Sequence, residues 1–167
     1  MKRVKQSNFE GLRAPKDVYG GSLLNSHPKV KRPLDSKLPT HLVLRATKSS
    51  MRKPQYFLKV NQIVKNACRK HGVRLYEYAN VGNHLHLLIK LRSRASWAAF
   101  IREVTGRIAQ LTSTKWLHRP FTRIVRGWKK AYKMAQQYVR LNLAEAEGFI
   151  TPLGIKILRG LRKTQPG

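Results

Sequence analysis

Apolar and polar positions alternate through residues 83–91, where the chain reads Asn83-His84-Leu85-His86-Leu87-Leu88-Ile89. Successive side chains of a strand point to opposite faces, so His84 and His86 share one face while the leucines at 85 and 87 occupy the other. The preceding residues 73–79 are β-branched and aromatic, and residues 80–83 have turn chemistry. The pattern predicts a β-hairpin whose second strand carries both histidines near its start.

The other periodic segments predict a mixed α+β fold. Residues 41–46 and 121–125 have the pattern of strands, and residues 56–71, 96–111 and 128–146 have apolar positions at helical spacing. In the last helix the apolar stripe comprises Trp128, Ala131, Tyr132, Ala135, Val139, Leu143 and Ala146. The order β-α-β-β-α-β-α predicts an antiparallel sheet with two helices packed on one face.

Composition divides the chain into a central domain and two basic extensions. Residues 1–38 are rich in Lys, Arg, Gly, Pro and Ser, which predicts an extended N-terminal arm. Residues 39–150 form the predicted domain, and residues 151–167 a basic C-terminal tail. The chain contains no secretory signal pattern and no run of 18 apolar residues, which favours a cytoplasmic protein without a membrane span.

Charge indicates the kind of partner. The 35 Lys and Arg residues against 7 Asp and Glu give a formal net charge of +28, which is typical of proteins that bind nucleic acid. Glu77 and Glu103 are the only acidic residues between positions 36 and 144. This scarcity argues against a site that holds metal ions with a cluster of carboxylates. Cys68 is the single cysteine, so neither a disulfide framework nor a cysteine-based zinc site is expected.

Two imidazoles about 7 Å apart at their Cα atoms can share one metal ion, but a firm site needs a third ligand. The last helix offers Tyr138 and Asn142, four residues apart and therefore on one face, at the margin of its apolar stripe. Tyr132 and Gln136 have the same spacing, although Tyr132 falls within the stripe, where a ring is more often part of the core. We favour the pair at 138 and 142 and keep the other as a competitor.

These segments together resemble a known family. The His84 to Ile89 strand resembles the histidine-hydrophobic-histidine strand of single-tyrosine HUH transposases of the IS200-like superfamily, and Tyr138-Val139-Arg140-Leu141-Asn142 with Gly148 resembles their tyrosine helix. The strand from His41 to Arg45 is similar to the opening strand of that family. The resemblance covers about residues 40–150 and is strongest to the branch that includes the REP-associated tyrosine transposases.

The resemblance implies a ferredoxin-like domain that cuts and rejoins single-stranded DNA, with hairpin-containing DNA as the expected target. His84, His86 and Asn142 are then expected to bind Mg²⁺ or Mn²⁺, and Tyr138 to attack the scissile phosphate, which leaves a 5′-phosphotyrosine and a free 3′-hydroxyl. Two departures are visible: Val81-Gly82 stands where many relatives have Met-Pro, and Leu143 follows Asn142 where many have Pro. Neither removes a proposed ligand or the nucleophile.

Attack by a phenol with a reference pKa near 10 needs help from nearby cations, which Lys129, Lys130, Lys133 or Arg140 could supply. These four, with Arg45 and Arg74, are the candidate DNA-binding residues, and Tyr76 and Tyr78 could stack on unpaired bases unless they belong to the core. Glu77 is either a support for the metal site or a surface ion pair.

Two other functions remain open from the sequence. A catalytically silent, domesticated DNA- or RNA-binding module would keep the fold, and a ribosome-associated basic protein would scatter His84, His86, Tyr138 and Asn142 in space. We expect a bacterial cytoplasmic protein that associates with the nucleoid when it is bound to DNA. The sequence leaves open whether the protein is a monomer or a homodimer and whether Tyr138 acts within its own subunit.

Overall fold

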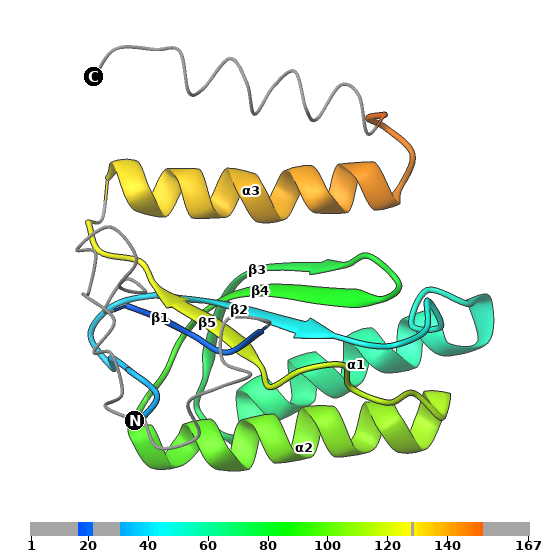
Figure 1. Ribbon diagram of the computed structural model, residues 1–167, viewed down its shortest axis with the longest axis horizontal. Coiled ribbons are helices and arrows are strands. Elements are labelled where there is room, and N and C mark those ends of the chain that lie inside the picture. Colours follow the sequence, from blue (N-terminus) through cyan, green and yellow to red (C-terminus); the bar gives the residue numbers. More distant parts are fainter. Residues whose placement is uncertain (1–16, 22–30, 128, 152–167) are drawn as a thin grey trace, which may run out of the picture.

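The structure, a computed structural model, describes residues 17–21, 31–127 and 129–151 (Figure 1). Its elements in chain order are β1 (Val18–Tyr19), β2 (Thr40–Arg45), α1 (Pro54–Lys70), β3 (Arg74–Asn80), β4 (His84–Lys90), α2 (Arg94–Thr112), β5 (Phe121–Ile124) and α3 (Lys130–Ala146). The strands form one five-stranded antiparallel sheet in the order β1-β5-β2-β4-β3. The predicted α+β fold with an antiparallel sheet is confirmed.

The sheet lies between two helical layers. Helices α1 and α2 cover one face, as the pattern predicts, and α3 covers the opposite face (Figure 1). Helix α3 packs there because its apolar stripe, within residues 131–143, must be buried against an apolar surface. The other face of the sheet is already covered by α1 and α2. No helix in the described ranges is long and apolar enough to cross a membrane.

The larger core fills the space between the sheet and the α1–α2 layer. Alternation turns Leu42 and Leu44 of β2, with Leu85, Leu87 and Ile89 of β4, toward this layer, where all five are at most 2% exposed. Helix α1 contributes Val60, Ile63, Val64, Ala67 and Cys68, and α2 contributes Phe100, Val104 and Ile108. The opposite alternation leaves both histidines of β4 on the face that α3 covers.

A smaller apolar cluster holds α3 on its face of the sheet. Its buried members are Ala79, Leu88, Val125 and Val139, and the partly buried side chains packed on them include Ala131, Tyr132, Ala135 and Leu143. The predicted stripe of α3 is therefore the docking surface, apart from Trp128, which lies outside the described residues. This docking fixes which side chains of α3 face the sheet.

One strand lies inside the segment predicted to be an extended arm. Strand β1 pairs with β5, with Val18 opposite Arg123 and Tyr19 opposite Thr122. Gly20 makes this approach possible, since a Cβ at this residue would lie 2.1 Å from the carbonyl oxygen of Pro120. The predicted division into two basic extensions and a domain remains a prediction, and residues 152–167 of the tail lie outside the described part.

The turn before β4 is built on a glycine. Gly82 has φ of +92°, which proline cannot adopt because its ring holds φ near −65°. Asn80 braces the turn, because its Oδ1 accepts from the Gly82 amide at 3.0 Å and its Nδ2 donates to the Met51 carbonyl at 2.9 Å. The turn at Val81-Gly82 therefore has a shape that a Met-Pro sequence at the same positions could not adopt. Strand β4 starts directly after this turn.

Candidate active site

Three histidines form a row across the sheet on the face covered by α3. The ring of His86 is stacked between those of His41 on β2 and His84 on β4, with centroid distances of 5.7 Å to each and interplanar angles of 10° and 15°. The row follows from the pairing of the two strands, which places His41 opposite Leu88 and Val43 opposite His86, so that His41 lies diagonally across from His86 on the same face. The predicted sharing of a face by His84 and His86 is confirmed, and a third imidazole joins them.

Tyr138 of α3 lies over this row. Its ring centroid is 5.7 Å from that of His86 and 5.4 Å from that of His41, at interplanar angles of 74° and 76°. The competing tyrosine is elsewhere: Tyr132 makes an edge-to-face contact with Tyr76 of β3 at 5.6 Å. Helix α3 therefore brings one of its two tyrosines to the histidines within a single chain.

Asn142 lies one helical turn after Tyr138 and is 9% exposed. Its Nδ2 donates to the carbonyl oxygen of Tyr138 at 2.6 Å, so the amide nitrogen is used within the helix and the oxygen stays available as an acceptor or ligand. The competing amide has another task, because Gln136 Nε2 donates to Glu77 of β3 at 2.7 Å.

The orientation of His84 is supported by its neighbour. His84 Nδ1 lies 2.6 Å from Asn83 Oδ1, and with an oxygen acceptor there Nδ1 carries the proton, which leaves the lone pair on Nε2. Burial, and next the charge of Arg45, lower the pKa of His84 below its usual value. Both effects favour the neutral ring that a metal ion requires. Sequence reasoning took Asn83 for a turn residue and missed this contact.

His41 is the site residue that sequence reasoning missed. Besides His86 and Tyr138, its ring meets Phe121 of β5 edge-to-face at 6.4 Å. Its Nε2 is buried and has no hydrogen-bond partner among the described residues. Burial, and next the charge of Arg123, lower the pKa of His41 to about 4, so the ring is neutral at physiological pH. The alternation of residues 41–45 contains the signal, but only strand pairing shows that this face adjoins the histidines of β4.

The candidate cations differ in their surroundings. Arg140 is bound by Glu77, with Nη2 and Nε donating to Oε1 at 2.6 and 3.0 Å, which raises the pKa of Arg140. Glu77 is therefore an ion-pair residue of the β3–α3 contact. The guanidinium of Arg74 lies 5.3 Å from the centroid of the Tyr76 ring. The remaining candidates, Arg45, Lys129, Lys130 and Lys133, are exposed.

One part of the predicted base-stacking surface is wrong. Tyr78 packs on the α1–α2 side of the sheet, and its hydroxyl donates to Asn61 at 2.9 Å. Tyr76 is on the α3 side. A bulge between Leu75 and Glu77 shifts the register there, so that Tyr76 and Glu77 both contact α3 although they are adjacent in sequence.

The donor set suits a small divalent cation only if an amide is included. Among the described residues, no three His, Cys, Asp or Glu side chains are gathered so as to hold a metal ion. His84 and His86 offer two imidazole nitrogens from one face of β4, and the side-chain oxygen of Asn142, one helical turn after Tyr138, is the candidate for a third donor. Nitrogen and oxygen donors of this kind are compatible with Mg²⁺ or Mn²⁺.

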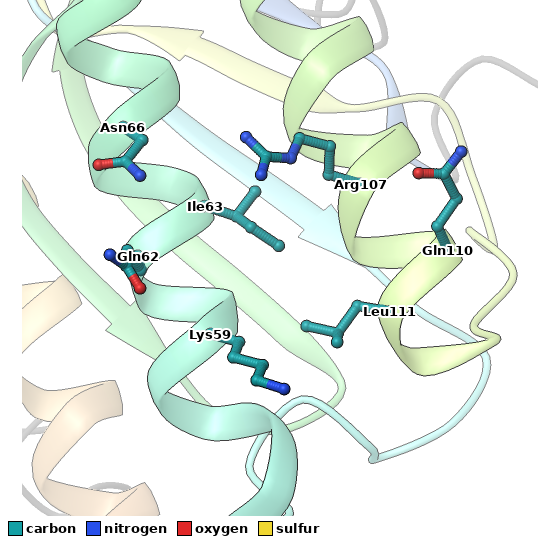
Figure 2. A pocket seen from close by; sticks show the side chains of 7 residues that line it. All are labelled: Lys59, Gln62, Ile63, Asn66, Arg107, Gln110 and Leu111. Carbon is teal, nitrogen blue, oxygen red and sulfur yellow. The ribbon is translucent and has the colours of Figure 1, made fainter.

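A groove lies on the far side of the sheet, away from the histidines. Figure 2 shows this groove between α1 and α2, of about 520 Å³, which is lined by Lys59, Gln62, Ile63, Asn66, Arg107, Gln110 and Leu111. Its lining has no histidine, tyrosine, cysteine or carboxylate. The chemistry-bearing side chains are therefore on the opposite face, under α3.

Comparison with known proteins gives the class to which this arrangement belongs. The sequence profile of the family described as "Transposase IS200 like" matches residues 35–143, which is more than half of the chain. The chain therefore belongs to the IS200-like transposase family. No curated protein matches the sequence significantly.

Two solved structures are similar to the chain. One is a REP-associated tyrosine transposase bound to a REP hairpin, with 13% sequence identity, a TM-score of 0.57, and coverage of 74% of this chain and 76% of the other. The second, described as a "putative transposase" from Deinococcus radiodurans R1, is 17% identical, covers 68% of this chain and 97% of its own, and has a TM-score of 0.42. The first likeness supports the fold.

Proposed function

We propose that this transposase-family protein is a DNA strand transferase that cleaves and rejoins single-stranded DNA, with Tyr138 as the nucleophile. The observation that supports the proposal is the 5.7 Å distance between the ring centroids of Tyr138 and His86, which come from adjacent layers of the fold, the α3 layer and the sheet. A scattered arrangement, as expected for a merely basic protein, would not bring the tyrosine of one layer to the histidines of another.

The proposed reaction exchanges one phosphodiester for another. The Tyr138 hydroxyl oxygen bonds to the scissile phosphorus, the bond from phosphorus to the 3′-oxygen breaks, and that oxygen leaves as a 3′-hydroxyl with the proton that the phenol gives up. The product is a 5′-phosphotyrosine. Because the number of phosphate ester bonds is unchanged, the 3′-hydroxyl of another strand end can reverse the step and release Tyr138.

His84, His86 and Asn142 are the proposed holders of Mg²⁺ or Mn²⁺. When bound, such an ion polarises phosphate oxygens and stabilises the charge that develops on them. The chain's own part is to keep the His84 imidazole neutral and oriented, which the lowered pKa of His84 and its hydrogen bond to Asn83 favour. Attack by a tyrosine needs no activated water, so the absence of a carboxylate base among these residues is chemically consistent.

The cations around α3 are the proposed phosphate contacts. Lys129, Lys130 and Lys133 belong to the start of α3, and Arg45 ends β2 beside His84. Arg140 already shares its charge with Glu77, which weakens the field that it offers to a phenolate, and Arg74 is placed against Tyr76. We therefore assign DNA binding to all six, and Arg140, whose charge Glu77 already offsets, has a smaller part in favouring the ionised tyrosine than its position in the sequence suggests.

A hairpin beside the cleaved strand is the proposed target. The support is the family and the similar fold of a transposase that was solved with a REP hairpin bound. Since Tyr138 and His86 meet in one chain, we propose that the tyrosine acts on the site of its own subunit. A cytoplasmic protein that associates with the nucleoid through DNA is part of the same proposal.

The test uses labelled single-stranded DNA from the flanks of the gene, with Mn²⁺, and follows a covalent protein–DNA adduct by denaturing electrophoresis. We expect an adduct with the wild type and with Tyr132→Phe, and none with Tyr138→Phe, which should still bind DNA. An adduct that survives Tyr138→Phe or is unaffected by a chelator would contradict the proposal. DNA binding without any adduct would support the silent binding module instead.

A further inference from the structure

His41 lies against His86 and Tyr138, two residues of the proposed reaction, and is therefore a candidate for a role in it. The three ring centroids of His41, His86 and Tyr138 are 5.4, 5.7 and 5.7 Å apart, a nearly equilateral triangle. Both imidazoles are nearly parallel to each other, and the tyrosine ring is nearly perpendicular to both. The phenol therefore lies against a pair of rings, only one of which belongs to the His84–His86 strand.

We propose that His41 is the positioning residue for Tyr138: its ring and that of His86 form a two-ring support that holds the phenol over the histidine row. The inference rests on the proposed function, because it assumes that the place of the Tyr138 hydroxyl matters for attack. Edge-to-face contacts between rings at 4.5–7 Å are favourable and directional, so they limit the angles that the tyrosine side chain samples.

The contacts of His41 favour packing as the means. The ring meets His86, Tyr138 and Phe121, whereas its buried Nε2 has no hydrogen-bond partner among the described residues. Strand β2 is central in the sheet, with β5 on one side and β4 on the other, so the backbone under His41 is held from both sides. The His41 ring on this strand is therefore a rigid support for the Tyr138 side chain of α3.

The main test compares the rate of adduct formation at saturating DNA with DNA affinity and Mn²⁺ affinity. His41→Ala removes the ring and should lower the rate about 10- to 100-fold, as small misplacements of a reacting group do, with both affinities unchanged. His41→Phe keeps a ring of similar shape and should return the rate to within about threefold of the wild type. A Phe variant as slow as the Ala variant would overturn the assignment to packing.

A matched control removes a similar contact at the other end of α3. Tyr132→Ala deletes the edge-to-face contact of α3 with Tyr76 of β3, 5.6 Å between centroids, without altering Tyr138, Tyr76 or Arg74. If its rate falls as far as that of His41→Ala, general loosening of α3 explains both results and the specific role of His41 is wrong. A wild-type rate for Tyr132→Ala with a slow His41→Ala supports the proposal.

A second measurement needs no DNA and so separates this inference from the proposed function. Fluorotyrosine is incorporated and the ¹⁹F resonance of Tyr138 is assigned by its loss in Tyr138→Phe. We expect His41→Ala to shift and broaden that resonance, His41→Phe to keep it narrow, and Tyr132→Ala to leave it in place. An unchanged resonance in His41→Ala would overturn the positioning role, whereas a shifted resonance in a protein that forms no adduct would overturn only the proposed function.

Discussion

Glu77 on β3 and Arg140 on α3 form an ion pair with 2.6 Å between Oε1 and Nη2, and Gln136, one turn earlier on α3, donates to the same oxygen. The carboxylate is available to the helix because the bulge after Leu75 turns Glu77 to the α3 side. This contact adds a polar anchor to the apolar docking that sets the rotation of α3 about its own axis, and that rotation decides whether Tyr138 faces the histidines. Glu77 thus links the edge of the sheet to the site without touching it.

Replacing Glu77 tests this link. Glu77→Ala should accelerate hydrogen exchange of the α3 amides while the amides of α1 and α2 keep their protection, because two side chains of α3 lose their shared acceptor. Exposed Glu147, just after α3, supplies the control as Glu147→Ala, which should leave exchange in α3 nearly unchanged. Equal exchange in both variants would mean that the apolar cluster alone holds the helix.

Gly82 should be sensitive to substitution although it bears no side chain. Gly82→Ala requires a residue with φ of +92° and brings a Cβ to 2.5 Å from Ser49 Oγ, so we expect a loss of about 1–3 kcal/mol in the free energy of unfolding. Gly106 in α2 is the matched control, since a Cβ there meets nothing within 4 Å. Gly106→Ala should raise stability by about 0.5–1 kcal/mol. Urea unfolding measures both, and a neutral Gly82→Ala would contradict the strained turn.

Local patterns were sufficient for the parts of the fold that depend on periodicity. The alternation around His84 and His86 predicts their face correctly, and the stripe through Val139 predicts the docking face of α3. Long-range pairing determines the rest. Nothing local to His41 shows that its strand lies beside β4, and the two-residue β1 is too short to have a pattern of its own.

Irregular backbone accounts for the other differences. The bulge between Leu75 and Glu77 reverses the alternation of β3, so Tyr78 lies in the core where the sequence allowed a base-stacking surface. Asn83 is a typical turn residue, and its side-chain hydrogen bond to His84 depends on the three-dimensional shape of the turn, which the sequence does not reveal. These contacts depend on one-residue shifts that periodicity does not resolve.

Acid should weaken the contact between α1 and α2. Hydrogen bonds from Lys70, and next from His71, lower the pKa of Glu103 to about 2 from its usual 4.5. A carboxyl whose pKa is lower in the folded state adds stability above its unfolded pKa and loses that contribution as the pH falls. The stability difference between wild type and Glu103→Gln should therefore be constant above about pH 5 and shrink between pH 4.5 and 2. Chemical unfolding across this range tests it, and a pH-independent difference would refute it.

Asn142 and Gln136, two side-chain amides of α3, should differ in their effect on metal binding. Asn142→Ala removes a proposed ligand and should weaken Mn²⁺ binding about tenfold or more, as measured by calorimetry. Gln136→Ala is the control, because this amide binds Glu77 and should leave the affinity unchanged. Equal affinities in all three proteins would remove Asn142 from the ligand set and leave the two histidines without their proposed partner.

Mapping the covalent linkage tests the central claim most directly. After incubation with DNA and Mn²⁺ and digestion with trypsin, mass spectrometry identifies the peptide that carries the nucleotide. The account predicts a 5′-phosphotyrosine on the peptide of residues 134–140, which contains Tyr138, together with a free 3′-hydroxyl on the released strand. A nucleotide on the peptide of residues 131–133, which contains Tyr132, or on any other residue, would contradict it.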